Sequence, residues 1–202
     1  GAGLTFSEMI ASREMINHSD KSLKMSDGCE GEAVQLAGCD PEVMAQAARM
    51  NVERGAGIID INFGCPVKKV VCKGAGAGIL KDIDKMVSLT AAMVKHTKLP
   101  VTVKTRLGWD ESTIRIVEVA ERLQDVSCKA ISIHGRTRVQ MYKGHADWKP
   151  IAEVKNNPRM HIPVFGNGDV DTPEAAVRTR DAYGLDGAMI GRASIGYPWF
   201  FR

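Results

Sequence analysis

Short apolar runs that end in polar residues recur along the chain, and they predict the strands of a parallel sheet. The clearest run is residues 57–63, whose apolar positions are interrupted only by Asp60 and Asn62. A nearly continuous apolar run is typical of a strand that is buried on both faces of a parallel sheet. The same pattern predicts further strands at residues 3–9, 32–37, 100–106, 130–134, 162–166 and 187–191.

Helical patterns separate these predicted strands. Asp40 and Pro41 form a typical helix start, because an aspartate side chain caps the first turn and proline fits into it. The apolar spacing that follows predicts a helix that ends at Gly55. Further helices are predicted at residues 79–96, 112–124, 148–154 and 172–183, and a loop with one helical turn is predicted at residues 17–31.

The alternation of strands and helices predicts an α/β fold built from consecutive βα units. Our interpretation is a (β/α)8 TIM barrel whose first strand is missing, in one domain that covers residues 1–202 of a longer protein. A doubly wound sheet is the alternative. The barrel is favoured because almost every predicted strand ends in a polar residue, as expected where many strands share one site.

Composition narrows the class of protein but does not identify its partner. Of the 202 residues, 44% are hydrophobic and 25% are charged, as in a soluble globular protein. No apolar run has membrane-spanning length. The five cysteines are scattered and form no CxxC pair, so we expect a cytoplasmic protein with neither a disulfide framework nor a metal site. A formal net charge of +3 is too small to indicate a nucleic-acid partner.

Polar and reactive side chains gather at the predicted carboxyl ends of the strands, where barrel enzymes place their sites. Taken singly, each has a structural explanation: Cys65 precedes a turn proline, and His134 fits a hydrogen-bonded core position. Taken together, they predict one site. The residues are Gln35, Asn62, Cys65, Lys104, Arg106, His134, Arg136, Asn167 and Arg192.

Two glycine-containing segments, residues 165–169 and 190–194, follow the last two predicted strands. Barrels commonly bind phosphate there, on backbone N–H groups that glycine leaves accessible. Arg192 can add charge-assisted hydrogen bonds. The pair predicts a phosphate grip for a cofactor, with Gln35 and Lys104 over its ring system, where a lysine stabilises an anionic reduced flavin.

Five motifs, in order along the chain, resemble the tRNA-dihydrouridine synthase family and, within it, the bacterial B-type branch. They are residues 60–66 with the basic glycine loop that follows, 103–109, 133–138, 165–169 and 190–193. Each motif alone is weak, but five in register are a strong signal, and the resemblance runs over residues 1–202. The resemblance implies an FMN-binding (β/α)8 barrel followed by a helical RNA-binding domain, which we expect to lie outside residues 1–202.

The resemblance also implies roles for residues of this chain. Cys65 would be the catalytic proton donor, and no metal is implied. FMN would be bound by Gln35, Lys104, His134, Asn167, Gly168, Asp169, Gly191 and Arg192. The substrate would be bound by Asn62, Arg106, Arg138 and Tyr142.

The implied reaction reduces the C5–C6 double bond of specific uridines in the D-loop region of tRNA. NADPH would reduce the flavin, hydride would pass from flavin N5 to C6 of the uracil, and Cys65 would protonate C5. A thiol suits this task, because thiols as a class are mostly protonated at neutral pH. We expect a monomer and no membrane partner.

Two alternative functions remain open. One is a flavoprotein similar to dihydroorotate dehydrogenase, acting on a free pyrimidine. Residues 136–148 are rich in basic and aromatic side chains, which favours a large anionic substrate instead. The other is a non-catalytic RNA-binding module, which Cys65 and the set of flavin-type residues disfavour.

Overall fold

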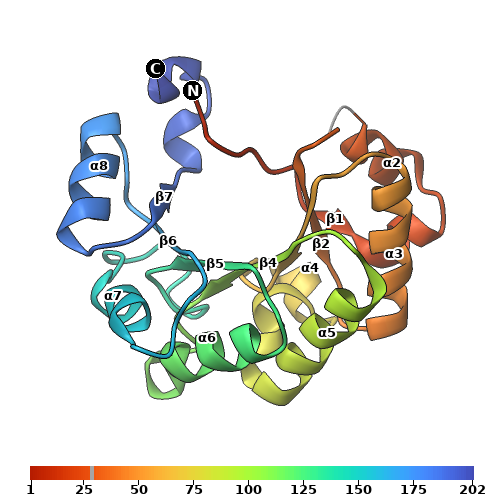
Figure 1. The fold of residues 1–202 in the computed structure, drawn as a ribbon, viewed down its shortest axis with the longest axis horizontal. Helices are drawn as coiled ribbons and strands as arrows, with labels where there is room; N and C mark the ends of the chain where they lie inside the picture. Colours follow the sequence, from red (N-terminus) through yellow and green to blue (C-terminus); the bar gives the residue numbers. More distant parts are fainter. Residues whose placement is uncertain (28–29) are drawn as a thin grey trace.

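Seven parallel strands form one sheet in the order of the chain (Figure 1). A computed structural model describes residues 1–27 and 30–202. The strands are β1 (Ile10–Ala11), β2 (Ala33–Ala37), β3 (Ile58–Asn62), β4 (Val101–Arg106), β5 (Ala130–His134), β6 (Val164–Asn167) and β7 (Gly187–Met189). A doubly wound sheet would reverse its strand order partway, whereas here each strand pairs with the next in sequence. The predicted α/β fold of barrel type is therefore confirmed.

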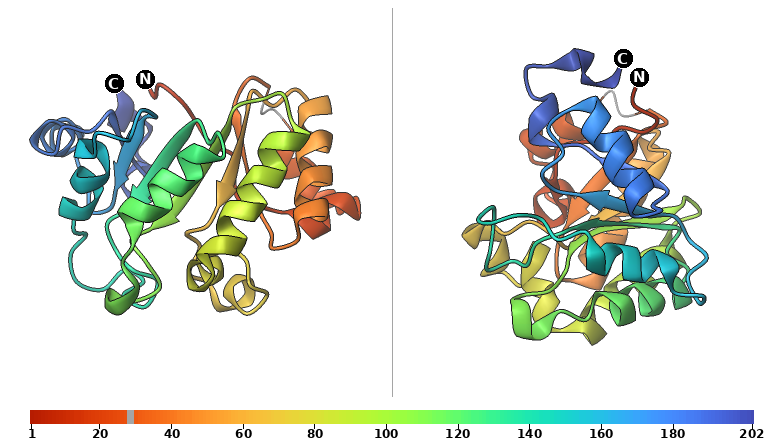
Figure 2. Two further views of the ribbon diagram at one scale, coloured as in Figure 1. Left: turned by 60° about the horizontal axis from the view of Figure 1, so that its bottom comes forward. Right: turned by 90° about the vertical axis from the view of Figure 1, so that its left-hand side faces the viewer.

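The helices lie around the outer side of the curved sheet (Figures 1 and 2). They are α1 (Ser12–Ile16), α2 (Asp20–Ser26), α3 (Pro41–Glu53), α4 (Lys68–Val71), α5 (Ile83–His96), α6 (Ile116–Asp125), α7 (Lys149–Asn156) and α8 (Pro173–Ala182). Short 3-10 helices are η1 (Gly76–Lys81), η2 (Glu111–Thr113), η3 (Arg192–Ser194) and η4 (Pro198–Phe201). The predicted cap is present, since the Asp40 side chain accepts hydrogen bonds from the first turn of α3.

Two predictions near the start of the chain are wrong. Residues 3–9 do not form a strand: Phe6 makes an isolated bridge to Ala33, and β1 begins only at Ile10. Residues 17–31 are not a loop with a single turn, because they contain α2, which follows α1. The buried residues of α2 are serines, which give no hydrophobic period for a sequence pattern to detect. Residues 28 and 29 of that prediction lie outside the described part of the chain.

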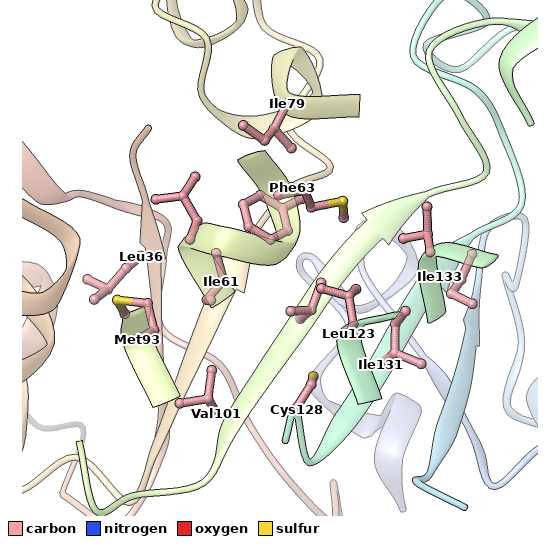
Figure 3. Close-up of a cluster of buried hydrophobic side chains, with 14 of the residues drawn as sticks. Leu36, Ile61, Phe63, Ile79, Met93, Val101, Leu123, Cys128, Ile131 and Ile133 are labelled. Carbon is pink, nitrogen blue, oxygen red and sulfur yellow. The ribbon is translucent and has the colours of Figure 1, made fainter. Parts of the chain in front are cut away.

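The hydrophobic core lies between the sheet and the outer helices (Figure 3). Ile59 and Ile61 of β3 are fully buried, as is Met93 of α5. Successive side chains of a strand point to opposite faces, so Asp60 and Asn62 face the inner side of the sheet. The same alternation directs polar side chains of the other strands inward and creates a polar interior behind an apolar outer layer.

Candidate functional site

The inner side of the sheet opens into a cavity of about 850 Å³ at the carboxyl ends of the strands. The structure brings twelve of the predicted site residues to this cavity; Arg136 and Arg138 do not line it. The lining includes Gln35, Asn62, Cys65, Lys104, Arg106, His134, Tyr142, Asn167, Gly168, Asp169, Gly191 and Arg192. Their proximity follows from the parallel register, which brings the strand ends to one rim. A hollow of about 530 Å³ beside α2 contains none of these residues.

Asp60 is a buried carboxylate at the base of this site, and it is 1% exposed. Thr102 Oγ1 donates to its Oδ1 at 2.5 Å, and Gln35 Nε2 donates to its Oδ2 at 2.7 Å. These contacts follow from strand register, since Asp60 pairs with Gln35 on β2 and with Thr102 on β4. Burial raises the pKa of Asp60 to about 6, although both hydrogen bonds and the charge of Lys104 oppose the rise.

Asn62 connects Gln35 to the turn that carries Cys65. Its Nδ2 donates to Gln35 Oε1 at 2.7 Å. Its Oδ1 accepts from the backbone N–H of Gly64 at 3.1 Å and from that of Cys65 at 2.8 Å. The Cys65 side chain is half-buried, and its thiol is not in a disulfide. The Asn62 side chain therefore holds the backbone of the turn through two hydrogen bonds.

Lys104 and Arg106 bring two cations to the inner face of β4. The pKa of Lys104 is lowered to about 7, chiefly by burial and secondly by the charge of Arg106. Within the described part of the chain, its Nζ makes a single long hydrogen bond of 3.4 Å, to Thr105 O. Arg106 is 2% exposed, and it donates to Gly64 O at 2.8 Å and to Met141 O at 2.8 Å. It therefore ties the turn after β3 to the loop after β5, while Lys104 remains available to an anionic ligand.

His134 is a neutral imidazole in this site. Burial, together with the charges of Lys104 and Arg106, lowers its pKa to about 2. Arg136 Nη1 lies 3.3 Å from His134 Nε2. Because a guanidinium can only donate, Nε2 must accept, and the imidazole proton sits on Nδ1. His134 can thus offer one N–H donor without adding positive charge.

Asp169 organises the turn after β6. Its Oδ2 accepts from Arg136 Nη2 and from the Ala146 N–H, both at 2.7 Å, and its Oδ1 lies 3.8 Å from Arg192 Nη2. Burial alone would raise the pKa of Asp169, but the hydrogen bonds from Arg136 and Ala146 hold it below its usual range. The carboxylate therefore links the loop after β5 to the arginine at the start of η3.

The predicted phosphate grip lies on the same rim. Gly168 has φ +118°, and a Cβ there would approach the Ala146 Cβ to 2.7 Å. By contrast, a Cβ on Gly191 would meet nothing within 4 Å. Asn167 Nδ2 donates to Met189 O at 2.8 Å and ties the ends of β6 and β7 together. Backbone geometry thus requires glycine at position 168, whereas glycine at position 191 leaves open space.

Tyr142 and Arg138 come from the same loop but have different surroundings. Tyr142 lines the cavity, is half exposed, and has the Arg192 guanidinium 4.7 Å from its ring centre. Arg138 stacks on Trp109 at 4.7 Å, and its Nη2 donates weakly to Pro66 O at 3.4 Å. Lys81 also contacts Trp109, at 3.9 Å. Arg138 therefore braces the segment after Cys65 from outside the cavity.

Several lining residues were not predicted. Met9 and Met189 line the cavity, and so do Pro66, Val67 and Val170. Apolar side chains carry no chemical signal of a site, and only the position of each next to a strand end could have indicated a lining role. Within residues 1–27 and 30–202, no three His, Cys, Asp or Glu side chains are grouped to hold a metal ion. No helix in that part of the chain is long and apolar enough to cross a membrane.

Comparison with known proteins gives consistent matches. A family model described as "Dihydrouridine synthase (Dus)" matches residues 1–202. The chain is 46% identical to a probable tRNA-dihydrouridine synthase of Rickettsia conorii, over 98% of the chain and 61% of that protein. It is also 46% identical to tRNA-dihydrouridine synthase B of Pseudomonas syringae pv. tomato, over 100% of the chain and 60% of that protein. The chain thus spans about three fifths of the length of these curated relatives.

Solved structures show the same type of fold at low sequence identity. Mandelate oxidase with (S)-2-phenylpropionate matches with a TM-score of 0.62 and 18% identity, over 93% of the chain and 55% of that protein. Mandelate oxidase with benzoyl-formic acid matches with a TM-score of 0.62 and 17% identity, over 93% of the chain and 56% of that protein. At this identity the likeness concerns the fold alone.

Proposed function

The chain belongs to the dihydrouridine synthase family, and we propose that the protein reduces the C5–C6 double bond of specific uridines in tRNA, using FMN and NADPH. The observation that carries the proposal is the position of Cys65, a free thiol on the rim of a cavity that also holds Lys104 and a neutral His134. A proton donor, a cation and an uncharged N–H donor thus face one space.

The residues around the cavity fit a flavin mononucleotide. Lys104 has a lowered pKa and, among the described residues, one long hydrogen bond, so a nearby anion can restore its positive charge and bind it. The open space at Gly191 lets a phosphate approach the backbone, and Arg192 lies beside it. We assign the cofactor to Gln35, Lys104, His134, Asn167, Gly168, Asp169, Gly191 and Arg192.

When bound, FMN that NADPH has reduced supplies the hydride for C6 of the uracil. Cys65 gives its thiol proton to C5, so the base gains one hydride and one proton, and the thiolate recovers a proton from solvent. Asn62 holds the Cys65 backbone in place, and Arg106 fixes the turn that precedes it. Tyr142 offers an exposed ring on which a base can stack.

The surroundings of the cavity suit an RNA substrate. Lys68, Lys69 and Lys73 follow Cys65, and Lys143 lies on the loop after β5; all four are exposed. Such cations would contact phosphates, while the target base leaves its stack to reach Cys65. We place this base in the D-loop region of tRNA and take the protein to be a cytoplasmic monomer. Arg138 acts on the substrate through the segment that it braces.

The test is direct detection of dihydrouridine. The protein, at its full natural length, is incubated with NADPH and unmodified tRNA, and the digested RNA is analysed by mass spectrometry. We expect a uridine that has gained two hydrogens with wild-type protein and with Cys72→Ala, the matched control, but not with Cys65→Ala. NADPH oxidation without dihydrouridine would point to a free pyrimidine as substrate, and absence of bound flavin would end the proposal.

A further inference from the structure

A chain of hydrogen bonds runs from the buried Asp60 to the backbone of Cys65. Asp60 accepts from Gln35 Nε2, Gln35 Oε1 accepts from Asn62 Nδ2, and Asn62 Oδ1 accepts from the Cys65 N–H, at 2.7, 2.7 and 2.8 Å. Every link is short and connects adjacent strands or the turn that follows them. The reaction proposed above uses Cys65 but gives no role to Asp60.

The direction of this chain is fixed at both of its ends. An amide side chain can turn over and exchange its donor and its acceptor, so the partners of Gln35 and Asn62 set their direction. The backbone N–H groups of Gly64 and Cys65 can only donate, so Asn62 presents its oxygen to them. An ionised carboxylate can only accept, so Gln35 must present its NH2 group to Asp60. Gln35 then presents its oxygen to Asn62, and Asn62 in turn presents its oxygen to Cys65.

The other hydrogen bond of Asp60 does not determine this direction. Thr102 Oγ1 donates to Oδ1, whereas the chain to Cys65 starts at Oδ2. A hydroxyl can donate or accept, so Thr102 adapts to its partner. Replacing Thr102 therefore provides a control, because it removes one hydrogen bond of the same carboxylate and leaves the hydrogen bonds from Asp60 to Cys65 unchanged.

We propose that Asp60 is a positioning residue for Cys65: its carboxylate anchors the Gln35 amide, and the Gln35 oxygen in turn holds Asn62 against the turn that carries the thiol. Its part in tRNA reduction rests on the proposed function, but the effect on the Cys65 thiol does not. Without an acceptor at position 60, the Gln35 amide loses its anchor, and Asn62 then loses the partner that holds it against the backbone N–H of Cys65.

The test measures thiol reactivity at each cysteine in the full-length protein. Variants Asp60→Leu, Asp60→Asn and Thr102→Val are treated with iodoacetamide and digested with trypsin. Cleavage after Lys68 and Lys69 places Cys65 and Cys72 on different peptides, so mass spectrometry follows both thiols in one sample. Exposed Cys72 serves as the internal reference.

We expect Asp60→Leu to change the alkylation rate of Cys65 by about threefold or more, since access controls thiol reactivity. Cys72 should not change. Asp60→Asn should stay near wild type, because its Oδ1 can accept from Gln35 while its Nδ2 donates to Thr102. Thr102→Val should also leave the Cys65 rate unchanged. Equal effects of Asp60→Leu and Thr102→Val, or equal effects of both Asp60 variants, would overturn the proposal.

A second readout follows the reaction. In Asp60→Leu, reduction of tRNA by the reduced enzyme should slow about tenfold to a hundredfold, since small misplacement of a reacting group costs that much. Reduction of the bound flavin by NADPH should be unchanged. If the thiol result appears but wild-type protein makes no dihydrouridine, the positioning role stands and the proposed function fails.

A set of isosteric variants tests the positioning role of Asp60 even if Asp60→Leu does not fold. Gln35→Glu places two acceptors against each other and should disturb the Cys65 alkylation rate. The double variant Asp60→Asn with Gln35→Glu restores a donor at position 60, and it should return the rate to that of wild type. A double variant that remains as disturbed as Gln35→Glu alone would overturn the proposal.

Discussion

Arg136 Nη2 donates to Oδ2 of Asp169 across 2.7 Å and joins the end of β5 to the turn after β6. The Arg136 side chain is only 3% exposed, whereas that of Asp169 is 33% exposed. The guanidinium therefore depends on this carboxylate, while the carboxylate also has access to water. Losing the carboxylate would leave a buried cation without its charged partner.

Asp169→Asn should lower the free energy of unfolding by about 2 kcal/mol, less than for a fully buried pair because Asp169 is partly solvated. FMN affinity should fall as well, since Arg192 loses its anchor at the rim. Urea unfolding and titration of flavin fluorescence measure the two effects. Asp171→Asn is the matched control, because Asp171 lines the same cavity but is exposed. Equal losses in both variants would contradict this account.

His134 should make the protein sensitive to acid. Its pKa is about 2 in the folded protein, whereas an unfolded histidine has a pKa near 6.5. Below pH 6.5 the unfolded chain therefore binds a proton that the folded protein does not, and stability falls as the pH falls. The expected loss from this group at pH 5 is about 2 kcal/mol relative to pH 7.

Urea unfolding of wild type and His134→Asn at pH 7 and pH 5 isolates this effect. Asp60 acts in the opposite direction, since its raised pKa stabilises the folded protein as the pH falls through about 6, but it is common to both proteins. We expect a smaller pH-dependent loss in His134→Asn than in wild type. His161→Asn, which changes an exposed histidine, should behave like wild type; an unchanged slope in His134→Asn would refute the assignment.

Much of the fold and the location of the site could be predicted from residue patterns along the strands. The period of two in β3 separates Ile59 and Ile61 from Asp60 and Asn62, and parallel strands bring their carboxyl ends together. That reasoning requires only local sequence. It does not show that Asp60 contacts Gln35, because the pairing depends on strand register.

The loop after β5 shows where prediction from sequence stops. Arg138 carries the charge expected of a substrate contact, yet it stacks on Trp109 outside the cavity. Backbone bonds of 2.9 Å from Arg138 N to Gly108 O and from Val139 N to Trp109 O fix the course of the loop. These contacts join segments distant in sequence, and no local pattern encodes them.

Gly168 is expected to tolerate no side chain, whereas Gly191 should accept one. Gly168→Ala combines positive φ with a 2.7 Å approach to the Ala146 Cβ, so it should cost about 1 to 3 kcal/mol of stability. Gly191→Ala meets no atom within 4 Å and should cost far less. Thermal unfolding of both flavin-free variants provides the comparison. Similar destabilisation by the two substitutions would show that the turn after β6 can adjust.

Lys104 should couple flavin binding to proton uptake. Its pKa is about 7 in the free protein, because burial and the charge of Arg106 disfavour the ammonium form. A bound flavin that places an anionic edge beside Nζ would raise this pKa. At pH 8 the free protein holds Lys104 mostly neutral, so binding should take up a proton, and affinity should fall as the pH rises above 7.

Calorimetric titration with FMN at pH 8, in buffers that differ in ionisation enthalpy, counts the protons taken up. We expect uptake approaching one proton in wild type and in Lys143→Met, which removes an exposed lysine from the loop after β5. Lys104→Met should bind FMN more weakly and without this uptake, because its side chain cannot carry charge. Proton uptake that persists in Lys104→Met would assign the titration to another group and remove the argument that Lys104 lies beside the flavin.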